Sequence, residues 1–76
     1  MKLTPINGNK LIKLLSLIDY HPVRQKGSHV ILEHSETKKI TIVPLRSKDV
    51  GVGLILTILK EVGLSRDDYF ELLKKV

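Results

Sequence analysis

The feature that most constrains this chain is the pair Gly27-Ser28, which separates two short stretches of alternating side chains. A two-residue loop with Gly at its first position is typical of a type II′ β-hairpin turn, because Gly adopts the required positive φ at little cost. The turn fixes the register of the two strands, which pairs His29 with Lys26, Ile31 with Arg24, and Leu32 with Val23. The chain is therefore expected to fold around an antiparallel hairpin.

Successive side chains of a strand point to opposite sides, so this register divides the hairpin into two faces. The face expected to pack on a core carries Val23, Gln25, Val30 and Leu32. The face expected to be open carries Arg24, Lys26, His29 and Ile31. The open face therefore sets one histidine between two fixed cations, an arrangement suited to holding a phosphate group.

Length and composition narrow the class of protein. The 76 residues suffice for one domain, residues 1–76, with a modest core. Cysteine is absent, which excludes disulfides and cysteine-ligated zinc and favours a cytoplasmic setting. No apolar run approaches the roughly 20 residues of a membrane span, so no membrane role is expected. The net charge of +5 arises within residues 1–50, which contain the hairpin, and it favours a polyanionic partner such as nucleic acid.

Three stretches carry the apolar spacing of helices that face a core. Asn7 is expected to cap a helix that ends near Ile18, and a second helix is expected from about Val52 to Val62. Gly63 fits the position just after that helix, and Ser65 fits the N-cap of a third. The sequence thus predicts one helix before the strands and two after them.

The strands are expected between these helices. Pro22 cannot donate to a sheet ladder, so the first strand is expected to start near Val23 and to lie at an exposed edge. The second is expected at residues 29–34, and the third at residues 39–43, where Pro44 ends it. The order predicts a two-layer α+β fold, a three-stranded antiparallel sheet with helices on one face. Its αβββα part is that of double-stranded-RNA-binding domains, with an extra C-terminal helix.

The register of the third strand depends on which of its faces is buried. Ile40 and Ile42 are expected to face the core, together with the buried side chains of the second strand. That arrangement requires an odd connecting loop of about three or five residues. Lys39 and Thr41 then join His29 on the open face.

His29 is the residue that we single out for catalysis. A cation opposite the imidazole disfavours its protonated form and leaves more of the neutral form that a general base requires. RNA carries its own nucleophile, the 2′-hydroxyl, so a cyclising ribonuclease needs a base, an acid for the leaving group and cations for the phosphorane charge. This chemistry requires no metal and no cofactor. His34 is expected to point to the opposite face and His21 to be solvated, and neither has the close second ligand of a zinc site.

Four segments of the chain occur in a recognisable order. They are Gly8–Leu15, Val23–His29 with Gly-Ser-His at a strand start, Ile40–Pro44 and Ile58–Ser65. In this order and spacing they resemble the HicA-type (YcfA-like) mRNA interferase toxins of bacterial and archaeal toxin–antitoxin pairs. The resemblance implies a fold like that of double-stranded-RNA-binding domains, ribosome-independent cleavage of mRNA, and a HicB-type antitoxin that occludes the site.

The resemblance also implies roles for individual residues. His29 falls on the catalytic histidine of the family and Gly27 on the glycine of the same signature. Arg46 stands where a histidine often follows the Val-Pro segment, and it preserves the cationic character there. The residues expected to contact RNA come from the hairpin, the third strand and the loop after it: Arg24, Lys26, Gly27, Ser28, Lys39, Arg46 and Lys48.

The second helix carries more apolar residues than one sheet face needs. Leu54 and Leu56 flank its core-facing stripe, so at least one of them is expected to be exposed and to belong to an interface. The resemblance names an antitoxin as the partner, and a homodimer would explain the same strip. The alternative is that the third helix packs over both leucines.

Three functions fit these observations. The first is a metal-independent ribonuclease toxin that depends on His29. The second is a non-catalytic RNA-binding module, in which basic residues hold phosphates by shape recognition. The third is an interaction protein whose apolar second helix docks a partner, its charges serving solubility. RNA cleavage separates the first from the second, and salt-sensitive RNA binding separates both from the third.

Overall fold

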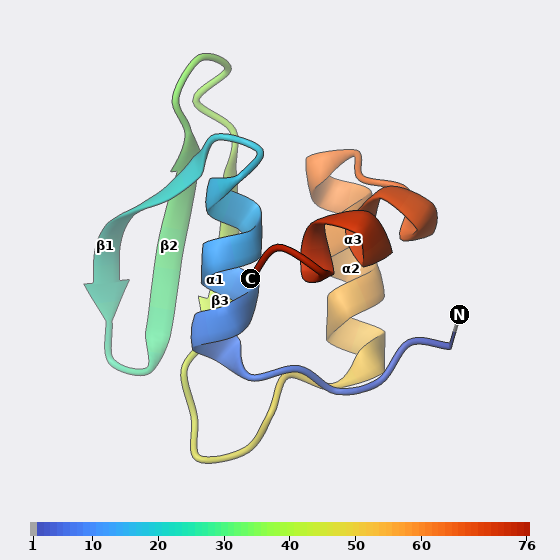
Figure 1. Cartoon of the computed structure of the whole chain (residues 1–76). Helices are drawn as coiled ribbons and strands as arrows, with labels where there is room; N and C mark the ends of the chain where they lie inside the picture. The colour runs from blue at the N-terminus through green and yellow to red at the C-terminus, as the bar shows by residue number, and fades with distance from the viewer. Residues whose placement is uncertain (1) are drawn as a thin grey trace.

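A computed structural model describes residues 2–76 and arranges them in two layers (Figure 1). The elements in chain order are α1 (Gly8–Ser16), β1 (Tyr20–Lys26), β2 (His29–His34), β3 (Ile40–Pro44), α2 (Val52–Val62) and α3 (Arg66–Leu73). The strands form an antiparallel sheet in the order β1-β2-β3, and the helices lie on one side of it (Figure 1). This is the expected α+β architecture, with the α-β-β-β-α order of double-stranded-RNA-binding domains and α3 added at the C-terminus.

The core lies between the sheet and the helices. α1 contributes Leu11, Leu14 and Leu15, which are fully buried and follow the spacing of one helical face. Burial of each such side chain stabilises the fold by roughly 1.5–3 kcal/mol. The other elements complete the same cluster with Tyr20, Val30, Leu32, Val43, Ile55, Ile58, Leu59 and Tyr69. Every helix therefore contributes to the layer that covers one face of the sheet.

The helix ends carry the caps expected from the sequence. The side chain of Asn7 accepts hydrogen bonds from the first turn of α1, and the Ser65 hydroxyl accepts one from the first turn of α3. Gly63 has a φ of +72°, and it ends α2 with the left-handed conformation that glycine adopts most readily. α1 ends at Ser16, two residues before the expected Ile18.

β1 differs from the expected first strand. It begins at Tyr20, which pairs with His34 and is buried in the core, so the strand starts three residues before Val23. A β-bulge lies between Pro22 and Arg24, and it sets Pro22, rather than Val23, opposite Leu32. The expected burial of Val23 is therefore wrong, since the bulge leaves 57% of this residue exposed, and Gln25 is exposed as well.

The side chains of β3 that face the core are the alternate set from the one expected. Glu33 pairs with Ile40, so the six residues 34–39 lie between them, and this even number reverses the faces. Ile40 and Ile42 are consequently exposed, whereas Thr41 is 2% exposed and Val43 is fully buried. The buried Thr41 hydroxyl is satisfied because it donates a hydrogen bond to Glu61 of α2 over 3.0 Å. The expectation that the two isoleucines face the core is wrong for this reason.

Candidate nucleic-acid interface

From its turn as far as Arg24, the β1–β2 hairpin has the register predicted for it. Its two-residue loop begins with Gly27 at a φ of +60°, and Lys26 lies opposite His29. Arg24 lies opposite Ile31, so it shares the face of Lys26 and His29. A Cβ added at Gly27 would meet no atom within 4 Å, so the backbone angle and not lack of space favours glycine here.

The three polar side chains of this face that lie nearest the turn are free to meet a ligand. Arg24, Lys26 and His29 are all exposed. Within residues 2–76 their side chains make no hydrogen bond or ion pair with one another or with other residues. A phosphate group could therefore approach the imidazole and both cations without displacing a protein contact.

The end of β3 lies beside the hairpin turn. Pro44 is opposite His29, and the next residue, Leu45, donates its backbone N–H to the carbonyl oxygen of Ser28. The antiparallel register therefore carries Arg46 alongside the Gly27-Ser28 turn. Arg46 is exposed, as expected for a residue that contacts RNA.

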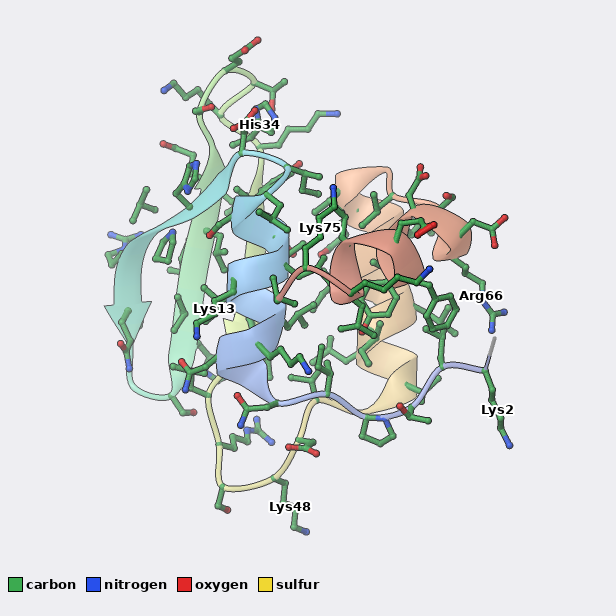
Figure 2. The ribbon with its side chains drawn as sticks, viewed as in Figure 1. Lys2, Lys13, His34, Lys48, Arg66 and Lys75 are labelled. Carbon is green, nitrogen blue, oxygen red and sulfur yellow. The ribbon has the colours of Figure 1, made fainter. Side chains whose placement is uncertain are left out.

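The loop that follows β3 is held at its other end too. Val50 and Ile6 exchange two backbone hydrogen bonds, of 3.0 and 2.7 Å, and both side chains are buried. Between these anchors the loop exposes Lys48, which extends from the lower end of the molecule (Figure 2). The hairpin turn lies at the same end in Figure 1. The fold thus gathers cations from the hairpin and from the loop at one end of the sheet.

The first turn of α1 packs tightly against this end. A Cβ added at Gly8 would lie 2.8 Å from the carbonyl oxygen of Pro44 and 2.8 Å from the side chain of Leu45. Contacts this short would force a shift, so only glycine lets the helix approach so closely. Gly8 therefore helps to fix the residues that border the hairpin turn.

Lys39 does not join the other cations. Its carbonyl oxygen accepts a hydrogen bond of 2.8 Å from the N–H of His34, at the far end of β2 from His29. Five residue steps along a strand span about 17 Å, too far for one phosphate to contact both Lys39 and His29. Figure 2 shows His34 and Lys48 at opposite ends of the molecule. The expectation that Lys39 and Thr41 share the open face with His29 is wrong, because the six-residue connection reverses which side chains of β3 face the core.

The other two histidines have different surroundings. His34 faces the helices, as expected, and contacts the Tyr20 ring edge-on at 5.0 Å between centroids. Its Nδ1 accepts hydrogen bonds from the backbone N–H groups of Glu36 and Thr37, which orders the turn after β2. His21 is exposed and lies opposite Glu33. Among residues 2–76, no group of three or more His, Cys, Asp or Glu side chains is arranged to hold a metal ion.

Sequence reasoning missed an apolar surface on the open face. Ile42 lies opposite Ile31 there, and Ile40 follows on the same side of β3. The side chains of β3 that face the core are reversed from the expected set after an irregular turn, in which Lys38 has a φ of +65°. Lysine does not signal such a conformation, because Gly and Asn are the residues that usually adopt it. No local pattern therefore marked these isoleucines as exposed.

The prediction that α2 leaves at least one extra leucine exposed is confirmed for both. Leu54 is 39% exposed and Leu56 is 43% exposed. α3 therefore does not cover them. α3 instead buries Tyr69 in the core.

Comparisons with known proteins identify the family. No helix in the described part of the chain is long and apolar enough to cross a membrane. No curated protein matches the chain with significance. The model of a protein family described as the HicA toxin of bacterial toxin–antitoxin systems matches residues 8–64, a segment that contains the hairpin, β3 and α2. Because this match covers most of its length, the chain belongs to the HicA toxin family.

Proposed function

We propose that this protein is a cytoplasmic, metal-independent endoribonuclease that cleaves mRNA, with His29 as its general base. The observation that carries the proposal is the cross-strand pairing of Lys26 with His29 on an exposed face. Membership in a family of toxins gives a reason for such a site. An exposed imidazole beside a fixed cation can act on a phosphodiester that the cation holds.

The RNA backbone is held by cations on two sides of His29. Arg24 and Lys26 approach from the hairpin, while Arg46 and Lys48 approach from the loop after β3. Gly27 has no side chain and lets the sugar-phosphate backbone come close to the turn, where Ser28 offers a hydroxyl. Phosphate contacts of this kind hold RNA regardless of its sequence.

The proposed reaction is a transesterification within the RNA. His29 takes the proton of a 2′-hydroxyl, whose oxygen attacks the adjacent phosphorus. The bond from phosphorus to the 5′-oxygen breaks, and that oxygen takes a proton from water. Lys26 and Arg24 stabilise the charge that develops on the phosphorane oxygens. The products are a 2′,3′-cyclic phosphate and a 5′-hydroxyl.

A substrate pair tests this reaction. One RNA oligonucleotide carries ribose throughout, and its matched control carries a single 2′-deoxyribose on the 5′ side of the cleaved bond. In the presence of EDTA we expect cleavage of the first, with 2′,3′-cyclic phosphate ends detected by mass spectrometry, and no cleavage of the second at that bond. Cleavage that leaves a 5′-phosphate, or that disappears with EDTA, would contradict the proposal.

One observation favours a second candidate, an RNA-binding module that does not cleave. Among residues 2–76, no side chain forms a hydrogen bond with the His29 imidazole, whereas a catalytic base is commonly oriented by a third group. The exposed cations would serve binding alone. Salt-sensitive binding of the all-ribose oligonucleotide without cleavage would support this alternative.

The partner surface belongs to the same proposal. We infer that Leu54 and Leu56 contact a HicB-type antitoxin, because exposed apolar strips on small proteins usually mark an interface. Residues 1–50, which carry the net charge of +5, add an electrostatic attraction for an acidic partner. A homodimer formed through the same strip is the competing possibility, and the oligomeric state of the free protein in solution distinguishes the two.

A further inference from the structure

Among residues 2–76, β3 lies at an edge of the sheet, with β2 on one side and no strand on the other. Hydrogen-bonded and non-hydrogen-bonded pairs alternate along an antiparallel ladder. The bond from the His34 N–H to Lys39 fixes that alternation, so Thr41 and Val43 direct their backbone groups toward β2. The N–H and C=O groups of Ile40 and Ile42 therefore point away from the sheet. These two residues have no backbone hydrogen bond across that edge within residues 2–76.

Charged side chains, which often protect an edge strand from pairing, are missing from β3. β3 contains no charged side chain, and the side chains of Ile40 and Ile42 are 57% and 43% exposed. Pro44 lacks an N–H, so it ends the segment that can accept another strand. An exposed apolar edge with free backbone donors is a template for strand addition.

A pocket borders the same edge. Its volume is about 280 Å³, and it is lined by Ile40, Thr41, Ile42, Leu54, Thr57 and Glu61. α2 stands on the β3 side of the sheet (Figure 1), so the pocket lies between the helix and the free edge. Every second side chain of an added strand would enter this pocket, while the others would cover the exposed isoleucines.

A second copy of the chain fits this edge poorly. Antiparallel twofold pairing of two β3 strands would bring both α2 helices to the same side of the joined sheet, above the shared strands. The 280 Å³ pocket has room for the side chains of a strand but not for a helix of 11 residues. The net charge of +5 on each copy adds a repulsion. An extended segment of another protein avoids both difficulties.

The charges around the edge indicate the chemistry of that segment. Lys38 and Lys39 precede β3, and Arg46 and Lys48 follow it. These four exposed cations outnumber the two nearby acidic residues of the same loops, Glu36 and Asp49. A segment with an apolar middle and acidic ends would therefore match the edge along its length.

We propose that the free edge of β3 accepts an extended segment of the antitoxin partner, apolar in its middle and acidic at both ends, as a fourth strand that also fills the pocket beside α2. The inference rests on the partner that membership in a toxin–antitoxin family implies, and not on cleavage by His29. The acidic end beyond Pro44 would cover Arg46 and Lys48, which the proposed function assigns to RNA.

Amide hydrogen exchange measured by NMR tests the proposal on the full chain. The probe is a capped synthetic peptide, Glu-Glu-Thr-Val-Thr-Val-Thr-Glu-Glu, and the control peptide has proline in place of both valines. In the free protein we expect fast exchange at Ile40 and Ile42 and slow exchange at Thr41 and Val43. The first peptide should slow exchange at Ile40 and Ile42, and the control peptide should not.

Three outcomes would overturn the proposal. The first is unchanged exchange at Ile40 and Ile42 at saturating peptide. The second is equal slowing along β1, the other edge strand. The third is protection of the two isoleucine amides in the free protein that grows with protein concentration, because that result assigns the edge to a second copy. None of these readouts depends on RNA cleavage, so they separate this proposal from the proposed function.

Variants at the edge separate the backbone donor from the side chain. Ile42→Pro removes an N–H that β2 does not use, so the β2–β3 ladder should persist. We expect it to weaken binding of the first peptide about tenfold more than Ile42→Ala, the loss expected for one hydrogen bond. Equal weakening by both variants would contradict pairing through the backbone.

A second pair of variants applies if Ile42→Pro loses the slow exchange of Thr41 and Val43. Ile40→Asp and Val23→Asp change the net charge equally, at residues that are both 57% exposed. Val23 lies on the opposite edge strand. Weaker peptide binding is expected for Ile40→Asp alone, and an equal effect of both changes would overturn the assignment to β3.

Discussion

Thr41 donates its hydroxyl to the carboxylate of Glu61 over 3.0 Å, and this bond joins the buried face of β3 to α2. It also marks the face of β3 that is turned to the helices. Val43 lies on that face and is fully buried, while Ile42 lies on the other face. Because Thr41 and Val43 face the helices, Ile40 and Ile42 are exposed on the other face of this edge strand.

Two threonine substitutions test which face of β3 is buried. Val43→Thr places a hydroxyl without a partner in the core, and it should lower the free energy of unfolding by roughly 1–3 kcal/mol. Ile42→Thr changes an exposed residue and should change stability by no more than about 0.5 kcal/mol. Urea unfolding of both variants gives the comparison. A larger loss for Ile42→Thr would mean that the opposite face is buried.

Two glycines, one in the hairpin turn and one in α2, should respond to alanine substitution with opposite effects on stability. Gly27 has a φ of +60°, so Gly27→Ala should destabilise the protein by about 1 kcal/mol. Gly53 is the second residue of α2 and has open space around it, so Gly53→Ala should stabilise by up to about 0.5–1 kcal/mol. Thermal unfolding of the two variants measures both signs. Equal effects of the same sign would contradict the turn assignment.

RNA affinity measured against salt concentration tests which cations hold phosphates. Arg24→Ala and Lys26→Ala should weaken binding to all sequences, and each should reduce the slope of log K against log salt by roughly one unit. Lys39→Ala is the matched control, because this exposed cation lies at the other end of the sheet. If Lys39→Ala alone reduces the slope, RNA binds at the opposite end from His29.

A lysine on α2 tests whether its exposed leucines serve an interface. Leu56→Lys should leave the Tm almost unchanged, because Leu56 is 43% exposed, yet it should weaken the complex with the antitoxin partner. Leu59→Lys is the control, since that residue is buried and an unpaired charge there should cost several kcal/mol. A large drop in Tm for Leu56→Lys would remove the interface hypothesis.

Local chemistry made much of this fold predictable. The turn at Gly27 and the caps at Asn7, Gly63 and Ser65 each depend on a few neighbouring residues whose backbone preferences are strong. Because the turn fixes the register, the pairing of Lys26 with His29 could be predicted as well. The geometry of the hairpin, on which the candidate site is built, could for this reason be predicted from the sequence.

The remaining errors come from irregular backbone and distant contacts. Lys38 adopts a positive φ without a glycine or asparagine to signal it, and the connection to β3 then reverses the strand's faces. The bulge at Val23 is equally unmarked, because no glycine stands there to signal it. The expected place of Lys39 in the site depends on the opposite face of β3, so the same reversal explains why Lys39 lies away from His29.

The central claim is that His29 is the catalytic base, and the rate of RNA cleavage by the His29→Ala protein tests it most directly. His21→Ala is the matched control, because His21 is also an exposed strand histidine but lies opposite Glu33, away from the turn. With EDTA present, we expect His29→Ala to lose about 10² to 10⁴-fold in rate while it keeps its Tm and its affinity for RNA. We expect His21→Ala to cleave at the rate of the unmodified protein. Cleavage by His29→Ala at that same rate would contradict the claim.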